Sequence, residues 1–107
     1  MKIRQVAFQL FTCRDLLKTP AEIAATFKRL RAIGYTAVEL CGMGPISEEE
    51  VTKILDGEGI VCCSSHESGD FILANPEKIV ERLERHHCST AAYPYAGNID
   101  LSNSKPR

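Results

Sequence analysis

The chain has 107 residues, 44% of them hydrophobic and 25% charged, which is an ordinary balance for one small globular domain. Its 13 basic and 14 acidic residues give a formal net charge of -1. Such a balance builds no field that would attract polyphosphate, so we expect no nucleic-acid partner. No signal-like apolar run begins the chain, and no apolar stretch reaches the roughly 18 residues of a membrane span. We therefore expect a cytoplasmic protein with no membrane partner.

The cysteines favour a reducing compartment. Their number is odd; the five are Cys13, Cys41, Cys62, Cys63 and Cys88. Four of the five lie in or at the end of apolar strand-like runs, where cysteine behaves as a small hydrophobe. No Cys-x-x-Cys pair is present, which argues against a zinc ribbon or a thioredoxin-type motif. We interpret all five as structural thiols, with the adjacent Cys62 and Cys63 on opposite faces of a strand.

The first strand and helix are predicted from alternation and capping. Residues 3 to 12 are mostly apolar with little charge, as in a strand covered on both faces. Thr19-Pro-Ala-Glu22 has the form of a capping box, with proline at the first helical position. We expect a helix over 20–33, ended by Gly34. Its apolar stripe would comprise Ile23, Ala24, Phe27, Leu30 and Ile33.

The cycle then repeats over residues 35–59. Residues 35–41 are predicted to form strand two, followed by a second capping box, Ser47-Glu-Glu-Glu50, whose acidic first turn suits the helix dipole. The short helix that follows would be ended by Gly57 or Gly59. Its buried stripe would be Val51, Ile54 and Leu55.

A third cycle completes the pattern. Residues 60–65 should form strand three, which ends at His66, and a loop containing Gly69 leads to a third helix that begins at Asn75-Pro76. Residues 90–93 are predicted as strand four, closed by Pro94. On the third helix we expect Ile79, Val80 and Leu83 to face inward, with Arg82 and Arg85 outside.

Strands that alternate with helices at roughly 25 to 30 residues per unit predict an α/β fold with parallel strands and right-handed crossovers. We expect four strands and three helices in one partial domain over residues 1–107. Residues 97–107 show no apolar periodicity and are expected to form an irregular tail. The last strand would be left uncovered, so we expect a truncated domain.

Three segments carry a resemblance to a known family. Phe8-Gln-Leu-Phe-Thr12 followed by Arg14-Asp15, then Gly34-Tyr-Thr-Ala-Val-Glu39, then Ser64-Ser-His66, resemble the N-terminal part of the xylose isomerase-like TIM barrels. That family includes sugar-phosphate isomerases and epimerases, relatives of hydroxypyruvate isomerase and inosose dehydratase, and a more distant apurinic-site endonuclease branch. The resemblance spans roughly residues 3 to 101.

The resemblance implies the first half of a (β/α)8 barrel, with the active site at the carboxyl ends of the strands. The family typically holds a divalent metal (Mg, Mn or Zn) with Glu, Asp and His from later strands. On this resemblance most of the metal set lies outside this chain, so we predict no metal ligands here and no tight metal binding by this chain alone. The implied partners are a small carbohydrate substrate and either a second copy or a complementary half-barrel.

Glu39 is the first candidate catalytic residue, because an unpaired carboxylate buried in an apolar strand costs several kcal/mol. It shares a strand face with Ala37 and Cys41, opposite Val38 and Leu40. If that face lines a barrel mouth, Glu39 orients a substrate hydroxyl or holds a neighbouring basic side chain. A structural carboxylate bonded to backbone amides or to an arginine is the alternative.

His66 is the second candidate catalytic residue. An imidazole at the carboxyl end of a parallel strand lies where ligands bind, and it can donate a proton, polarise a carbonyl or bind metal. The family often has a histidine here, and in the endonuclease-like branch the corresponding position is a zinc ligand. The alternative is a solvated histidine in a polar loop beside Ser64, Ser65 and Glu67.

Further substrate-binding candidates follow strands one and four. Gln9, Thr12 and Arg14 are placed to contact substrate, and Arg14 suits a carboxylate or phosphate; it could equally pair with Asp15 or Glu39. Tyr93 and the nearby Tyr95 could form the wall of a sugar pocket or serve only packing.

Several tempting features are better explained structurally. His86 and His87 lie near the C-terminus of the third helix, with His87 on its packed edge. The acidic run 48–50 is read as a helix first turn, and Gly42-Met-Gly44 lacks the Lys-Ser/Thr of a phosphate loop.

The leading interpretation is a sugar or sugar-phosphate isomerase or epimerase domain that moves a proton on a small carbohydrate with metal assistance. A non-catalytic half-barrel that self-associates or needs a partner is the first alternative. A zinc-dependent hydrolase like the apurinic-site endonucleases is the second, and it needs more ligands and a more basic groove than this sequence has.

Overall fold

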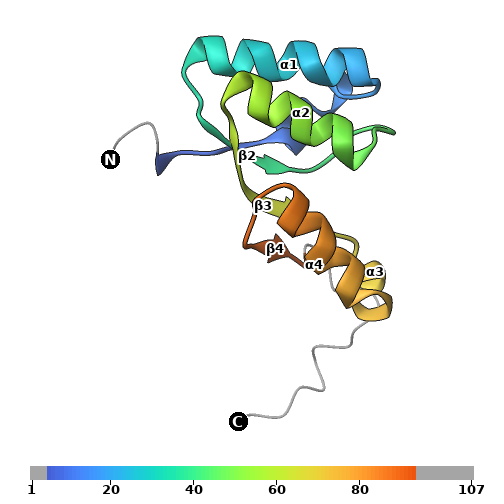
Figure 1. The fold of residues 1–107 in the computed structure, drawn as a ribbon. Helices are drawn as coiled ribbons and strands as arrows, with labels where there is room; N and C mark the ends of the chain where they lie inside the picture. Colours follow the sequence, from blue (N-terminus) through green and yellow to red (C-terminus); the bar gives the residue numbers. More distant parts are fainter. Residues whose placement is uncertain (1–4, 94–107) are drawn as a thin grey trace, which may run out of the picture.

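The computed structural model of the protein describes residues 5–93 (Figure 1). The predicted tail over 97–107, the strand-closing Pro94 and Tyr95, and the first residues of the predicted strand one lie outside this range.

Four parallel strands form one sheet, as the alternation of strands and helices predicted. They are β1 (Phe8–Gln9), β2 (Ala37–Leu40), β3 (Val61–His66) and β4 (Ala91–Ala92). Their order in the sheet is β1-β2-β3-β4, so each strand lies beside its neighbour in sequence. The carboxyl ends of all four strands therefore lie along one edge of the sheet.

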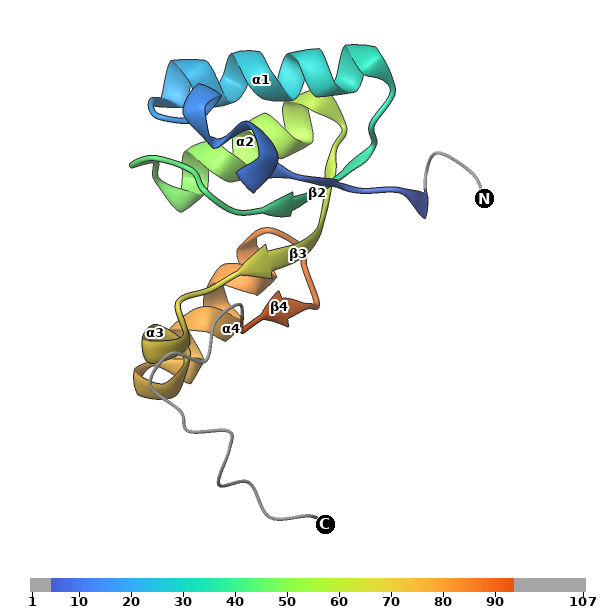
Figure 2. The same ribbon diagram turned by 180° about the vertical axis from the view of Figure 1, so that it is seen from behind.

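Three of the helices match the predicted ones: α1 (Pro20–Ile33), α2 (Glu48–Glu58) and α4 (Pro76–Arg85). Helix α1 contacts α2, and α2 contacts α4. In Figure 1 α2 and α4 lie in front of the strands, and in Figure 2, seen from behind, β3 and β4 lie in front of α4. The helices thus cover one face of the sheet. The core between them comprises Leu10, Leu17, Ile23, Phe27, Leu30, Val38, Leu40, Val51, Leu55, Ile60, Cys62 and Cys88.

Local caps explain why α1 and α2 begin where they do. The Thr19 hydroxyl accepts a hydrogen bond from the Glu22 amide at 3.2 Å, and the Ser47 hydroxyl accepts one from the Glu50 amide at 3.1 Å. Gly34 ends α1, and Gly59, which is left-handed with a φ of 64°, ends α2. Of the two glycines that the sequence offered as the end of α2, Gly59 is the one used.

Of the predicted strand over residues 3–12, only Phe8–Gln9 is a strand in the described residues, and the prediction for residues 5–7 and 10–12 is wrong. The chain turns instead into a 3-10 helix, η2 (Leu10–Leu16). Leu10 and Leu17 are fully buried and Cys13 packs against the core, a spacing of three and four residues that turns one side of the segment inward. A short apolar run has the same composition whether it forms a strand or a helix, so alternation alone misassigned it.

Helix α3 (Gly69–Ala74) replaces the predicted loop, which makes four α-helices in residues 5–93 where three helices were expected. The Ser68 hydroxyl accepts a hydrogen bond from the Phe71 amide at 3.5 Å and begins the helix. None of its residues is buried, and Leu73 is 67% exposed. A helix without an apolar stripe gives no periodic signal.

Some helix faces also differ from prediction. Ala24 and Ile33 on α1 are exposed, as is Val80 on α4. Arg82, which was expected on the outside of α4, is only 31% exposed and lies in an ion-pair network. The buried face of α4 is narrower than predicted, and its main contacts with other helices are with α2 and α3.

A bulge in β3 decides which side chains reach the uncovered face. Val38 pairs with Cys62, but Glu39 pairs with Ser64, so Cys63 is the extra residue. Cys62 is buried and Cys63 is exposed, as the opposite-face expectation required. Beyond the bulge the alternation is reversed, and His66 comes to the side of the sheet that carries Glu39.

Candidate functional site

Three of the predicted site residues meet at the carboxyl edge of the sheet. Gln9 ends β1, Glu39 lies in β2 and His66 ends β3. The Gln9 amide nitrogen donates to Glu39 Oε1 at 2.9 Å, and His66 Nε2 lies 3.1 Å from the same oxygen. The register places Gln9 beside Glu39, and the β3 bulge brings His66 to the same side. Among the interactions considered for Glu39, the structure shows contact with a neighbouring basic side chain, His66, and the role of Glu39 in substrate binding stays a prediction.

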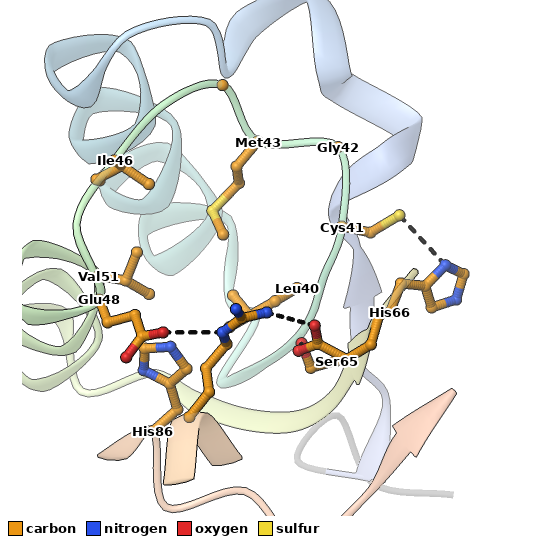
Figure 3. Close-up of a pocket in the computed structure, with 13 residues that line it drawn as sticks. Leu40, Cys41, Gly42, Met43, Ile46, Glu48, Val51, Ser65, His66 and His86 are labelled. Atoms are coloured by element: carbon orange, nitrogen blue, oxygen red, sulfur yellow. Dashed lines mark hydrogen bonds and ion pairs between the residues drawn. The ribbon is translucent and has the colours of Figure 1, made fainter. Parts of the chain in front are cut away.

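Cys41 is the fourth member of this cluster and was predicted only as a structural thiol. Its Sγ lies 3.3 Å from His66 Nδ1 (Figure 3), whereas Glu39 lies at the other ring nitrogen, Nε2. Burial, and then the negative charge of Glu39, raise the pKa of the Cys41 thiol. The sequence signal that could have identified Cys41 as a site residue is its position two residues after Glu39, which places both side chains on the same face of the strand.

One tautomer of His66 satisfies its contacts with both Glu39 and Cys41, while the Gln9 amide nitrogen, which lies 3.5 Å from His66 Nε2, donates to Glu39 instead. With the ring proton on Nε2, the imidazole donates to Glu39, and Nδ1 accepts from the Cys41 thiol. Glu39 then accepts from both Gln9 and His66. The arrangement can hold a proton on the imidazole and stabilise the resulting charge with a carboxylate.

A cavity of about 410 Å³ adjoins the cluster. His66, which is 24% exposed, forms part of the cavity wall, and its partner Glu39 is 21% exposed. The wall combines polar groups with one aromatic ring; it is formed by Gln9, Phe11, Cys41, Gly42, His66, Glu67 and Ser68. A space of this size suits a small ligand.

A second polar cluster lies between α2, α4 and the end of β3, and sequence reasoning missed it. Arg82 Nε donates to Glu48 Oε1 at 2.9 Å, and Arg82 Nη1 also donates to Glu67, which is only 4% exposed. Ser65 donates to Glu67 at 3.0 Å, and Arg85 pairs with Glu48. Of these side chains, Glu48, Ser65, Glu67 and Arg82 border a cavity of about 310 Å³ (Figure 3). Burial raises the pKa of Glu48, but the hydrogen bonds from Arg82 and Arg85 outweigh it and the net pKa is lowered.

Of the two adjacent histidines, His86 is the buried one. It is 5% exposed, and its Nδ1 lies 3.1 Å from the Thr52 hydroxyl of α2. Burial lowers the pKa of His86. His87 is exposed, with a φ of 53°, so the expected position of His87 on the packed edge of the helix is wrong. Helix α4 ends at Arg85, and the chain beyond it no longer follows the helical wheel.

The remaining predicted site residues do not join the Glu39–His66 cluster. Arg14 donates to the Phe11 carbonyl at 3.1 Å, and its guanidinium lies 4.3 Å from the centre of the Phe11 ring. Thr12 is exposed in η2. Tyr93 lies against Gly69, where even a methyl group would collide with its ring. Substrate binding by these side chains stays a prediction.

The cluster does not form a metal-binding set by itself. Within residues 5–93, no three His, Cys, Asp or Glu side chains converge where they could hold one ion. Cys41 and Glu39 lie at different nitrogens of His66, so they cannot share a metal with it. The described residues therefore do not fit a complete divalent-metal centre, and the zinc-hydrolase interpretation gains no support from them.

These features define a parallel α/β protein with a Gln-Glu-His-Cys cluster at the carboxyl edge of its sheet, where parallel sheets bind ligands. No protein-family model matches the chain, and no curated protein sequence matches it significantly. Among residues 5–93, none of the helices is both long and apolar enough to cross a membrane.

Proposed function

We propose that this chain is a sugar or sugar-phosphate isomerase or epimerase-type domain, built as the first half of a xylose isomerase-like (β/α)8 barrel. The observation that carries the proposal is the contact of Gln9, Glu39 and His66, which come from three successive strands and meet at their carboxyl ends. Barrel enzymes assemble their sites in this way, from the ends of several strands.

Two features of the sheet support a barrel. The strands are parallel and in sequence order, and the helices lie on one face. A doubly wound sheet would instead reverse its strand order and place helices on both faces. In a barrel, the uncovered face that carries Glu39 would be the interior, and the Gln9–Glu39–His66 edge would be its mouth.

The chemistry of the cluster suits a polyhydroxylated substrate. Glu39 is a charged acceptor that can bind a sugar hydroxyl, and the Gln9 amide can both donate and accept. The His66 imidazole can donate a hydrogen bond to a sugar oxygen or accept one from a sugar hydroxyl. In this proposal Glu39 and His66 orient substrate and assist proton transfer, and they are not the central acid-base pair.

A divalent ion of the family (Mg, Mn or Zn) would polarise the carbonyl and hydroxyl oxygens of a bound sugar. Because residues 5–93 bring no three such ligands together, we route no step through this ion. The ligands would have to come from further strands.

We also propose that activity requires those further strands, supplied by a second copy or by a complementary half-barrel. Within residues 5–93, the outer edges of β1 and β4 have no neighbouring strand. Apolar side chains are exposed, among them Val61 at 59% and Phe11 at 47%. An open parallel edge with apolar surface favours association. A non-catalytic, self-associating half-barrel is therefore the second candidate, and mass in solution with activity of each species distinguishes the two.

The test of function is solvent-deuterium exchange into a panel of aldoses, ketoses and their phosphates, followed by NMR with Mg²⁺, Mn²⁺ or Zn²⁺ added. An isomerase incorporates deuterium at the carbon beside the carbonyl, since it removes that proton. We expect Glu39→Gln and His66→Gln to slow exchange at least tenfold, with Glu49→Gln on exposed α2 as the control. Absence of exchange in every assembly state, or unaltered exchange in both site variants, would contradict the proposal.

A further inference from the structure

We propose that Cys41, His66 and Glu39 form a nucleophilic triad, in which Cys41 attacks the carbonyl carbon of a small ester or thioester and becomes acylated. The imidazole lies between the other two side chains: Nδ1 is 3.3 Å from Cys41 Sγ, and Nε2 is 3.1 Å from Glu39 Oε1. This is the order of nucleophile, base and orienting acid that thiol acyl transfer requires.

The same geometry distinguishes a triad from a metal site. Ligands of one ion converge on one point, whereas Cys41 and Glu39 lie at different ring nitrogens. A bridging imidazole can take a proton from the thiol at Nδ1 while its Nε2–H remains bonded to the carboxylate. Gln9 donates to Glu39 at 2.9 Å and helps to hold that carboxylate in position.

Access to the thiol comes from the cavity of about 410 Å³, whose wall includes Cys41 and His66. Phe11, which is 47% exposed, adds an apolar surface for an acyl chain. Gly42 follows Cys41 with a φ of 70°, so the backbone turns sharply after the thiol at the end of β2. A side chain at such a turn is presented at the sheet edge.

The other cysteines lack this environment. Cys62 and Cys88 are buried, and the Cys13 thiol donates to the Leu10 carbonyl. Cys63 is exposed in the β3 bulge and provides an internal reference for a thiol that is accessible without the bridging imidazole contact. Burial raises the pKa of both Cys41 and Cys63, so each rests as a thiol, and the reactivity of Cys41 depends on His66 as general base.

In the proposed reaction, the Cys41 proton moves to His66 Nδ1 while Sγ forms a bond to the carbonyl carbon, whose π electrons move to oxygen. The carbonyl re-forms as the ester C–O bond breaks, and the leaving alkoxide takes the proton from His66. The product is an alcohol and an S-acyl thioester on Cys41. Water then attacks the thioester with His66 as base, which releases the carboxylic acid and restores the thiol. Glu39 stabilises the imidazolium in both steps.

The test uses the full chain and 4-nitrophenyl acetate as the probe, with nitrophenolate release followed by absorbance and the acetylated peptide identified by mass spectrometry. We expect acetylation of Cys41 at least about tenfold faster than of Cys63, and Cys41→Ser to remove it. His66→Gln should slow it by about 100-fold, the range of general-base catalysis. Glu39→Gln should give an intermediate rate.

Acetylation of Cys63 at the same rate as Cys41, or an unchanged Cys41 rate in His66→Gln, would overturn the proposal. A second experiment uses the unaltered chain, so that its result does not depend on whether the variants fold. In concentrated urea the rates at Cys41 and Cys63 should become equal, because the imidazole contact is lost. A preference for Cys41 that persists in urea would show that local sequence causes it, and it would also overturn the proposal.

Discussion

Glu39 Oε1 lies 3.1 Å from His66 Nε2, although the two residues belong to different strands and one of them follows a bulge. Each side chain is about a fifth exposed, at 21% and 24%. The pair is therefore partly solvated, and its position at the sheet edge suits ligand contact better than it suits fold stability.

We predict that Glu39→Gln and His66→Gln each change the free energy of unfolding by less than about 1 kcal/mol, because water can replace the lost partner at a partly exposed pair. Urea denaturation of the single and double variants measures this. Leu10→Ala, at a fully buried position, is the control and should cost about 3 kcal/mol. A coupling of several kcal/mol between Glu39 and His66 would instead make the pair part of the structural framework.

Removal of Arg82 should have the larger effect on folding. Arg82→Met leaves the buried carboxylate of Glu67 with only the Ser65 hydroxyl of its present side-chain donors, and we expect a loss of about 2 to 3 kcal/mol. Chemical denaturation measures the loss. Arg85→Met is the matched control, since Arg85 is 60% exposed, and it should cost less than about 1 kcal/mol. Recovery of stability in Arg82→Met with Glu67→Gln would confirm that the unpaired charge is the cause; equal losses at Arg82 and Arg85 would contradict it.

Acidification should destabilise the protein in two stages. The pKa of His86 is lowered by burial, so the unfolded chain binds this proton more readily, and stability should fall as pH drops below the ordinary value of 6.5. Glu48 and Glu67 oppose this shift, whereas Arg82 and Arg85 add to it. The net pKa of Glu48 is lowered, so its contribution is present above its ordinary pKa of 4.5 and is lost as pH falls below it.

Both stages are tested by measuring the urea midpoint of unfolding between pH 7.5 and 3, a range that covers roughly the ordinary pKa values of histidine and glutamate. His86→Gln should remove the upper stage, whereas His87→Gln, at the exposed neighbour, should leave it in place. A stability that is flat between pH 7 and 5 in the unaltered protein would contradict the role of His86.

Two glycines should respond in opposite ways to alanine. A Cβ on Gly44 would collide with the backbone of Lys18, and the Gly44 amide already donates to the Leu17 carbonyl at 2.6 Å, so neither segment can move aside easily. Gly44→Ala should therefore destabilise the fold by more than about 1 kcal/mol. Gly57 lies within α2, and beyond the helix's own backbone nothing lies within 4 Å of the position that a methyl group would occupy. Gly57→Ala should therefore stabilise by about 0.5 to 1 kcal/mol. Thermal unfolding of both variants checks the signs.

The helix caps offer a second matched pair. Ser47 accepts a hydrogen bond from the Glu50 amide, so Ser47→Ala should cost about 1 kcal/mol. Asn75 occupies the equivalent position before α4, but its side chain makes no cap hydrogen bond, and Asn75→Ala should cost less than about 0.5 kcal/mol. A comparison of the two denaturation curves decides this, and a larger loss at Asn75 would contradict the assignment of the caps.

The candidate site was predictable where it depended on strand ends. Gln9, Glu39 and His66 were each chosen from the sequence because a polar residue stood in or after an apolar strand, and the parallel sheet brings them together. Cys41 was not chosen as a site residue, because only its contact with His66, which is 25 residues away in the sequence, places it in the cluster. The Arg82 network was missed for the same reason, since its carboxylates are 15 and 34 residues from the arginine.

The amino-acid sequence by itself determined helices α1 and α2 and the alternation with parallel strands, because caps, glycine termini and apolar stripes act over four residues or fewer. Only the tertiary structure decided that residues 10–16 form a 3-10 helix, that His86 rather than His87 is buried, and that a bulge at Cys63 reverses the faces of β3. Each of these outcomes depends on contacts between residues that lie far apart in the sequence, which local sequence patterns do not encode. The bulge matters most for function, since without it the alternation from buried Cys62 would place His66 on the helix-covered face, away from Glu39.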